Sequence, residues 1–106
     1  MTTFNDRERA EEAKFAHDEE QEFRVHARRN RLLGTWAAER MGLSAAEAEP
    51  YAKSVVQADF EESGDEDVIR KILGDLISAG LNVDEAEVRA ALKAKEAEAR
   101  LALQGG

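Results

Sequence analysis

Residues 63–80 carry the pattern that most constrains the fold of this chain. Apolar residues recur there with helical spacing and would form one wide stripe, made of Val68, Ile69, Ile72, Leu73, Leu76 and Ile77. Ser63 and Glu66 have the spacing of a capping box, and Gly80 is suited to close the last turn in a left-handed conformation. The pattern predicts a helix over residues 65–79.

A second helix is predicted over residues 84–103. Asp84 is a suitable N-cap with Glu87 three residues later, and Val83 and Val88 have the spacing of a hydrophobic staple. The apolar stripe continues with Val88, Leu92 and Ala99.

Residues 44–61 give two competing signals for the start of a helix. Ser44 and Glu47 form another capping-box pattern, whereas Pro50 stands too deep in the segment to be a first-turn proline. We prefer a short turn at 44–48 and a helix over 50–61; a helix that starts at Ser44 and kinks at the proline is the alternative.

The stretch before Gly42 changes character along its length. Its second half has a core stripe of Val25, Leu32, Leu33 and Trp36, which predicts a helix over residues 21–41. In the first half only Phe4 and Phe15 share a face, and glutamates interrupt it, so this segment lacks a core of its own. We therefore predict an all-α, four-helix bundle-like domain over residues 21–104 and a mobile, helix-prone N-terminal arm over residues 1–20.

Composition removes several classes of protein. The 106 residues include no cysteine, which excludes disulfide scaffolds, and no apolar run approaches the length that spans a bilayer. The formal charge of −8 argues against nucleic acid and anionic lipid as partners, because phosphate contact needs an excess of Lys and Arg. We expect a single cytoplasmic domain without a signal peptide or membrane insertion, and a monomer when free.

The negative charge is unevenly distributed along the chain. Residues 1–23 carry −5, residues 24–40 carry +4, residues 41–69 carry −7 and the remainder is neutral. The basic segment contains Arg24, Arg28, Arg29 and Arg31. These arginines either neutralise acidic helices that pack on them or face a phosphate group or an acidic partner; weak binding of ADP or ATP belongs to the second reading.

No pattern for catalysis stands out. His17 and His26 are nine residues apart and point to opposite sides of a helix, so they cannot share a metal. The acidic turn from Asp59 has a glycine where a calcium-binding loop needs it, but Arg70 occupies the position of the essential glutamate. The chain also lacks the glycine-rich phosphate loops. We expect no enzyme activity, no metal site and no required cofactor.

Three stretches resemble a known family: FNDRERAEEAKFAHD at 4–18, ARRNRLLGTWAAE at 27–39 and ADFEESGDEDV at 58–68. They are similar in order and spacing to the zeta subunit, the inhibitor protein of alphaproteobacterial F-type ATP synthases. This resemblance implies a four-helix domain whose mobile N-terminal segment enters the catalytic head of the enzyme and blocks ATP hydrolysis. The inhibitory stretch would be residues 1–18, with contacts from Phe4, Arg7, Arg9, Lys14 and Phe15.

The resemblance also implies the partners and the location. The arm would bind between a catalytic and a noncatalytic subunit near the rotor shaft, in contact with the alpha, beta and gamma subunits. The protein would then be cytoplasmic and peripheral at the inner membrane when bound. The residues themselves leave two alternatives open, a weak nucleotide-binding module and an acidic helical adaptor, and residues 1–20 could equally be an ordinary frayed terminus.

Overall fold

The computed structural model describes residues 2–61 and 64–105, with side chains for residues 19–59 and 64–103. It contains four helices: α1 (Thr2–Arg40), α2 (Ala45–Glu61), α3 (Asp65–Ser78) and α4 (Glu85–Gly105). The described residues include no strand, and the predicted all-α class with a helical N-terminal segment is confirmed. Residues 2–20 of the predicted arm form the first half of α1, and this helix continues into the domain without a break.

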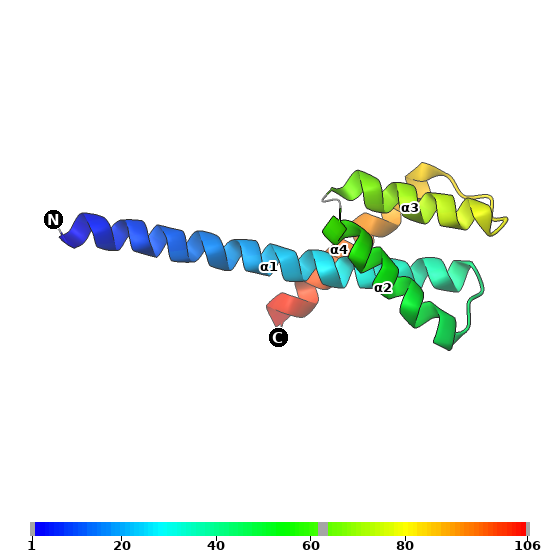
Figure 1. The fold of residues 1–106 in the computed structure, drawn as a ribbon, viewed down its shortest axis with the longest axis horizontal. Helices are drawn as coiled ribbons and strands as arrows, with labels where there is room; N and C mark the ends of the chain where they lie inside the picture. Colours follow the sequence, from blue (N-terminus) through cyan, green and yellow to red (C-terminus); the bar gives the residue numbers. More distant parts are fainter. Residues whose placement is uncertain (1, 62–63, 106) are drawn as a thin grey trace.

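The four helices form a domain at one end of a long rod. Helix α1 contacts each of the other three helices, and the molecule measures 65 × 26 × 21 Å. Figure 1 shows the N-terminal half of α1 projecting beyond α2, α3 and α4, with the C-terminus lying beside the middle of α1. The shape follows from the length of α1, since 39 helical residues extend about 58 Å.

The predicted apolar stripes meet in one core. Its fully or nearly fully buried members come from all four helices and the α3–α4 turn: Leu33, Ala37, Val55, Val68, Ile69, Ile72, Leu76, Val83, Val88 and Leu92. Ile77, predicted in the stripe of α3, is instead 55% exposed. The stripe is wider than the surface that the neighbouring helices cover, so its edge stays in contact with water.

Two glycines end helices as predicted. Gly42 has φ 73° and Gly80 has φ 86°, both in the left-handed region. The amide of Leu43 donates to the carbonyl of Ala38 over 3.0 Å, and the amide of Leu81 donates in the same way to Leu76 over 3.1 Å. These are Schellman motifs, which bind carbonyls that the helix end would otherwise leave unpaired.

Helix α2 begins five residues earlier than predicted. The Glu47 amide donates to Ser44 Oγ over 3.2 Å, and the Ser44 amide donates to the Glu47 carboxylate over 3.1 Å, which completes the capping box. Pro50 lies inside the helix and removes one hydrogen bond to the carbonyl of Ala46. Ala46 is exposed, so water can hydrate that carbonyl, and the cap is enough to hold the first turn.

The start of α3 also differs from its prediction. Ser63, the expected cap, lies outside the described residues, and the N-cap position is held by Gly64 without a side-chain hydrogen bond. The Glu66 carboxylate binds both terminal nitrogens of Arg89 on α4, at 2.9 and 2.6 Å. This ion pair lowers the pKa of Glu66. At α4 the prediction is confirmed, because Asp84 Oδ1 accepts the Glu87 amide at 2.9 Å.

Helices α1 and α2 cross closely at Gly34. A Cβ atom at this position would lie 2.7 Å from the Cα atom of Ala52 and 3.2 Å from Val55 Cγ2. A distance of 2.7 Å to a backbone atom is not tolerated without moving a helix, so Gly34 permits a contact that any larger residue would prevent.

Candidate functional site

The predicted inhibitory residues lie in the projecting half of α1. Phe4, Arg7, Arg9, Lys14 and Phe15 belong to its helical backbone, and their side chains lie outside the described residues. At about 100° per residue, the two phenylalanines are about 20° apart around the axis and about 16 Å apart along it. The helical backbone is therefore compatible with one aromatic edge along the arm.

Within the part of α1 whose side chains are described, Glu22 contacts another helix of the domain. The two terminal nitrogens of Arg100 on α4 donate to the Glu22 carboxylate at 2.6 and 3.0 Å. These hydrogen bonds lower the pKa of Glu22. Glu19 and Glu20, the preceding residues with described side chains, are exposed, whereas Val25 is buried. Among the residues with described side chains, contact between α1 and the rest of the domain is therefore seen from Glu22 onward.

A buried polar network follows directly after this boundary. Arg29 is fully buried, and its Nη1 atom lies 3.0 Å from Asp65 Oδ1 and 3.1 Å from Glu96 Oε1. Its Nε atom donates to Asn30 Oδ1 at 3.0 Å, and Asn30 in turn donates to Asp59 at 2.9 Å. One arginine therefore connects α1 with acids on α3 and α4.

His26 lies at the edge of the same network. Its Nε2 atom is 3.6 Å from Glu22 Oε2 and 3.7 Å from Glu96 Oε1. The two carboxylates come from α1 and α4, so this histidine also stands where the projecting helix joins the domain. His17, the other histidine, lies outside the residues with described side chains.

The structure divides the predicted arginine cluster into two groups. Arg29 points into the domain, whereas Arg24, Arg28 and Arg31 are exposed. The sequence contained a signal for this division: at about 100° per residue, Arg29 falls inside the stripe of Val25 and the other core residues, and the remaining three lie within about 60° of one another on a different face. We missed it because the cluster was judged by sequence proximity and not by helix face.

The three exposed arginines differ in their partners. Arg24 pairs with Glu20 at 3.0 Å, and Arg31 pairs with Glu49 of α2. For Arg28 the described residues provide no ion pair, and the same holds for Lys53, an exposed lysine of α2 that the sequence pattern does not mark. Both cations are therefore left to solvent or to a partner.

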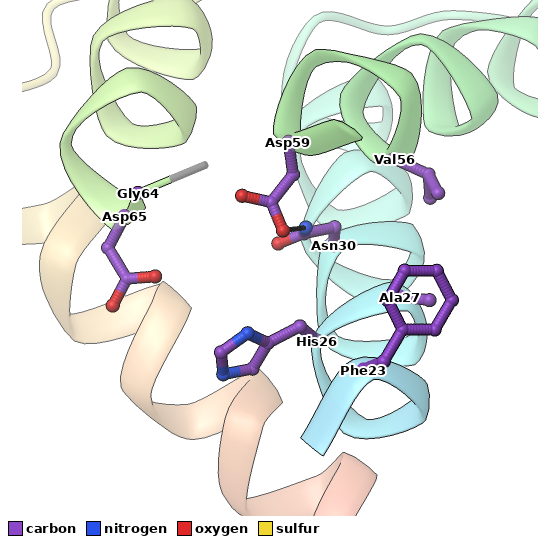
Figure 2. A pocket seen from close by; sticks show the side chains of 8 residues that line it. All are labelled: Phe23, His26, Ala27, Asn30, Val56, Asp59, Gly64 and Asp65. Carbon is purple, nitrogen blue, oxygen red and sulfur yellow. Dashed lines mark hydrogen bonds between the residues drawn. The ribbon is translucent and has the colours of Figure 1, made fainter. Parts of the chain in front are cut away.

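A groove of about 370 Å³ opens at the junction between arm and domain. It is lined by Phe23, His26, Ala27, Asn30, Val56, Asp59, Gly64 and Asp65. Figure 2 shows Phe23, Ala27 and Val56 together on one side, while the polar side chains lie on the side of α3 and α4. A second groove of about 530 Å³ is lined by Arg31, Lys53, Val56 and Gln57. Because Val56 lines both, the two hollows adjoin along the α1–α2 contact.

The described residues offer little for other kinds of site. No group of three or more acidic or histidine side chains gathers there in a way that could hold a metal ion. Across the same residues, no helix combines the length and apolar character needed to cross a bilayer.

Comparison with known proteins places these features in a family. No curated protein matches the chain. A protein whose structure was determined by solution NMR matches with a TM-score of 0.68 and 51% sequence identity, over 78% of this chain and 94% of that chain. The family model described as ATPase inhibitor subunit zeta matches residues 1–102, which confirms the resemblance noted from the sequence. This chain therefore belongs to the family of ATPase inhibitor subunit zeta.

Proposed function

We propose that this protein inhibits ATP hydrolysis by the F-type ATP synthase and does so by inserting residues 1–18 into a catalytic interface of the enzyme's head. Family membership supports the inhibitor role itself and an association with ATP synthase. The observation that carries the proposal is the extent of the match, because residues 1–102 include the arm as well as the four-helix domain. The protein would act as a regulator without catalytic activity of its own.

The geometry of α1 supports insertion as the mode of action. Residues 2–20 extend about 28 Å as a helix, and they project past the other helices (Figure 1). A single projecting helix can enter a groove that is too narrow for the whole domain. The Glu22–Arg100 pair and the buried Arg29 hold the following turns, so the domain sets the direction in which the arm points.

The residues proposed for contact are the same five that the sequence indicated. Phe4 and Phe15 would be the apolar anchors on one face of the arm, and Arg7, Arg9 and Lys14 would pair with acids of the head. The interface would lie between an alpha and a beta subunit and reach the gamma subunit. Bound there, the protein would be cytoplasmic and peripheral at the inner membrane.

The proposed mechanism is a wedge. A helix bound in an interface that must close during hydrolysis prevents that closure and stops rotation of the shaft. Rotation in the direction of synthesis would open the same interface and release the helix. Inhibition would therefore act on hydrolysis and have little effect on synthesis.

The experiment that tests this proposal replaces the two aromatic anchors. Phe4→Ala with Phe15→Ala should raise the concentration needed to inhibit ATP hydrolysis by the purified head by at least about a hundredfold, because aromatic anchors dominate interface energies. The matched control is Asp6→Ala with His17→Ala, which truncates two residues about 200° around the helix from Phe4. The control should retain inhibition within about threefold. Equal inhibition by the aromatic variant and the unchanged protein would reject the arm as the inhibitory element.

Weak binding of ADP or ATP by the exposed arginines is a separate prediction that the same protein can test. Arg28 is the best placed of the cluster, since it is exposed and has no acidic partner among the described residues. An NMR titration with ADP that leaves the amide shifts of residues 24–40 unchanged would remove nucleotide binding. Recovery of this protein from cells without ATP synthase subunits would instead favour the adaptor alternative.

A further inference from the structure

The exposed face where α1 meets α2 carries cations beside an apolar floor, and the proposed action of the arm does not use it. We call this surface the basic groove and define it by Phe23, Arg24, Arg28, Arg31, Lys53 and Val56. Its parts come from two helices, and the side chains of Arg24 and Arg31 are 66% and 54% exposed. Arg31, Lys53 and Val56 line one hollow of this surface, and Phe23 and Val56 line an adjoining hollow that extends toward Asp59 and Asp65.

The basic groove has an excess of positive charge in a chain whose formal charge is −8. Glu20 and Glu49 each pair with one of its four cations. Arg28 and Lys53 have no such acid within the described part of the chain, although acids outnumber bases by 23 to 15. These two cations, on neighbouring helices, can therefore pair with an external carboxylate without first breaking an ion pair within the described residues.

The floor of the groove is apolar and partly open. Phe23 is 53% exposed, and Figure 2 shows its ring beside Ala27 and Val56, at the apolar side of the hollow that His26 and Asn30 also line. An exposed aromatic side chain next to a rim of arginine is the arrangement found at protein–protein contacts, where the aromatic residue is the anchor and the charges select the partner. The groove therefore has both parts of a protein-binding surface.

The spacing of the cations indicates the shape of that partner. Arg24, Arg28 and Arg31 follow one another by about 6 Å and about 4.5 Å along the axis of α1. Carboxylates at positions i, i+4 and i+7 of another helix repeat at the same intervals and also share one face. A phosphate group is much more compact than this row, and the groove has no backbone cradle for one.

We propose that the basic groove binds an acidic amphipathic helix on the protein that receives the arm. This inference rests on the proposed function, since it places the second contact on the same ATP synthase head. The continuous helix α1 puts the groove directly behind the arm, so both surfaces can be occupied by one partner. The arm would block the enzyme, and the basic groove would add affinity and speed association through its charge.

The test measures binding of full-length variants to the purified catalytic head by calorimetry. Arg28→Glu with Lys53→Glu should weaken binding about tenfold in low salt, and the difference should shrink at high salt, where exposed charges are screened. The matched control is Arg70→Glu with Lys93→Glu, two exposed cations on α3 and α4, which produces the same net charge. Arg28→Lys with Lys53→Arg should bind normally, and Phe23→Ala should weaken binding by several fold to tenfold.

Four outcomes would overturn the inference. The first is an equal loss of binding in the groove variant and the Arg70/Lys93 control. The second is normal binding by the groove variant. The third is competition between ADP and the head for Arg28 and Lys53, which would make the groove a nucleotide site. The fourth is a dimer in sedimentation that the groove variant dissociates, which would make it a self-interface.

The experiments distinguish failure of the basic-groove proposal from failure of the proposed inhibitory arm. The groove variants are also measured in full-length protein that carries Phe4→Ala and Phe15→Ala, where their tenfold effect should persist. Unchanged inhibition by that aromatic variant would reject the arm, whatever the groove variants do. Unchanged binding of the groove variants in both backgrounds would reject the basic groove and leave the arm untouched.

Discussion

The two halves of α1 are both helical, but buried side chains of the second half pack against the other helices and the described side chains of Glu19 and Glu20 in the first half do not. From Val25 to Ala38 the helix buries Val25, Leu33, Ala37 and Ala38, and Arg29 pairs with acids on two other helices. Before Glu22, the described side chains of Glu19 and Glu20 are exposed, and the backbone extends away from the domain. Helical structure and tertiary anchoring are therefore separable within one element.

This difference suggests how the protein keeps an arm ready for binding. An isolated helix of about 19 residues is marginal in water because its first turn is costly to form. Here the domain half of α1 already provides that turn, and the arm only has to extend an existing helix. A segment held in this way needs less ordering when it binds, which favours affinity.

The largest expected effect contrasts two adjacent arginines of the domain half. Arg29→Ala should lower the free energy of unfolding by about 3 kcal/mol, because it leaves Asp65 and Glu96 without their buried partner. Arg28→Ala should change it by less than about 0.5 kcal/mol, since Arg28 is exposed. Urea denaturation followed by circular dichroism measures both. Similar values for the two variants would show that the division of the cluster is wrong.

Gly34 and Gly74 give the next contrast, because both are helical glycines. Gly34→Ala should destabilise the domain by about 2 kcal/mol, since the added Cβ meets the backbone of Ala52 at 2.7 Å. Gly74→Ala should stabilise it by about 0.5–1 kcal/mol, because no atom lies within 4 Å and alanine favours helix. Thermal unfolding distinguishes the signs. A stabilising Gly34→Ala would contradict the close crossing of α1 and α2.

Acid should weaken the ion pair between Glu22 and Arg100, which joins α1 to α4 next to the arm. Hydrogen bonds from Arg100 lower the pKa of Glu22 from its ordinary value of 4.5, so its stabilising contribution is present above about pH 4.5 and is lost as the pH falls through the lower folded-state value. Glu22→Gln should reduce the urea midpoint slightly at pH 7, and the difference from the unchanged protein should shrink as the pH falls below 4.5. Glu19→Gln, at an exposed position of the arm side, is the control and should show no such difference.

The smallest expected effect on stability comes from removing the arm. Deletion of residues 2–18 should change the free energy of unfolding of the domain by less than about 0.5 kcal/mol, because the buried residues described on α1 start at Val25. The same deletion should abolish inhibition of ATP hydrolysis. Amide hydrogen exchange in the full chain should be fast before residue 20 and slow from Val25 onward. A large loss of stability in the deleted protein would show that the arm is part of the folded core.

The helices could be predicted because their signals are local. The Gly42 and Gly80 ends and the Asp84 cap all appear in the structure where residue type and spacing placed them. The predicted start of α2 at residue 50 was wrong, because the prediction gave more weight to Pro50 than to the Ser44 capping box. The capping box holds the first turn, and the helix continues through the proline with one hydrogen bond fewer.

The candidate site was less predictable, since it depends on contacts between distant residues. Lys53 and Val56 join Arg31 only because α2 packs across α1 at Gly34. The five contact residues of the arm stay predictions, because their side chains lie outside the described part of the molecule.

By itself the sequence determined the all-α class, the segments that become helices and the family to which the chain belongs. These depend on caps, on apolar periodicity and on the order and spacing of residues within short stretches. Only the tertiary structure decided that Arg29 pairs with Asp65 and Glu96, and that Glu66 pairs with Arg89 on another helix. Ion pairs between helices depend on which helix faces meet in space, and no local pattern of residues specifies that choice.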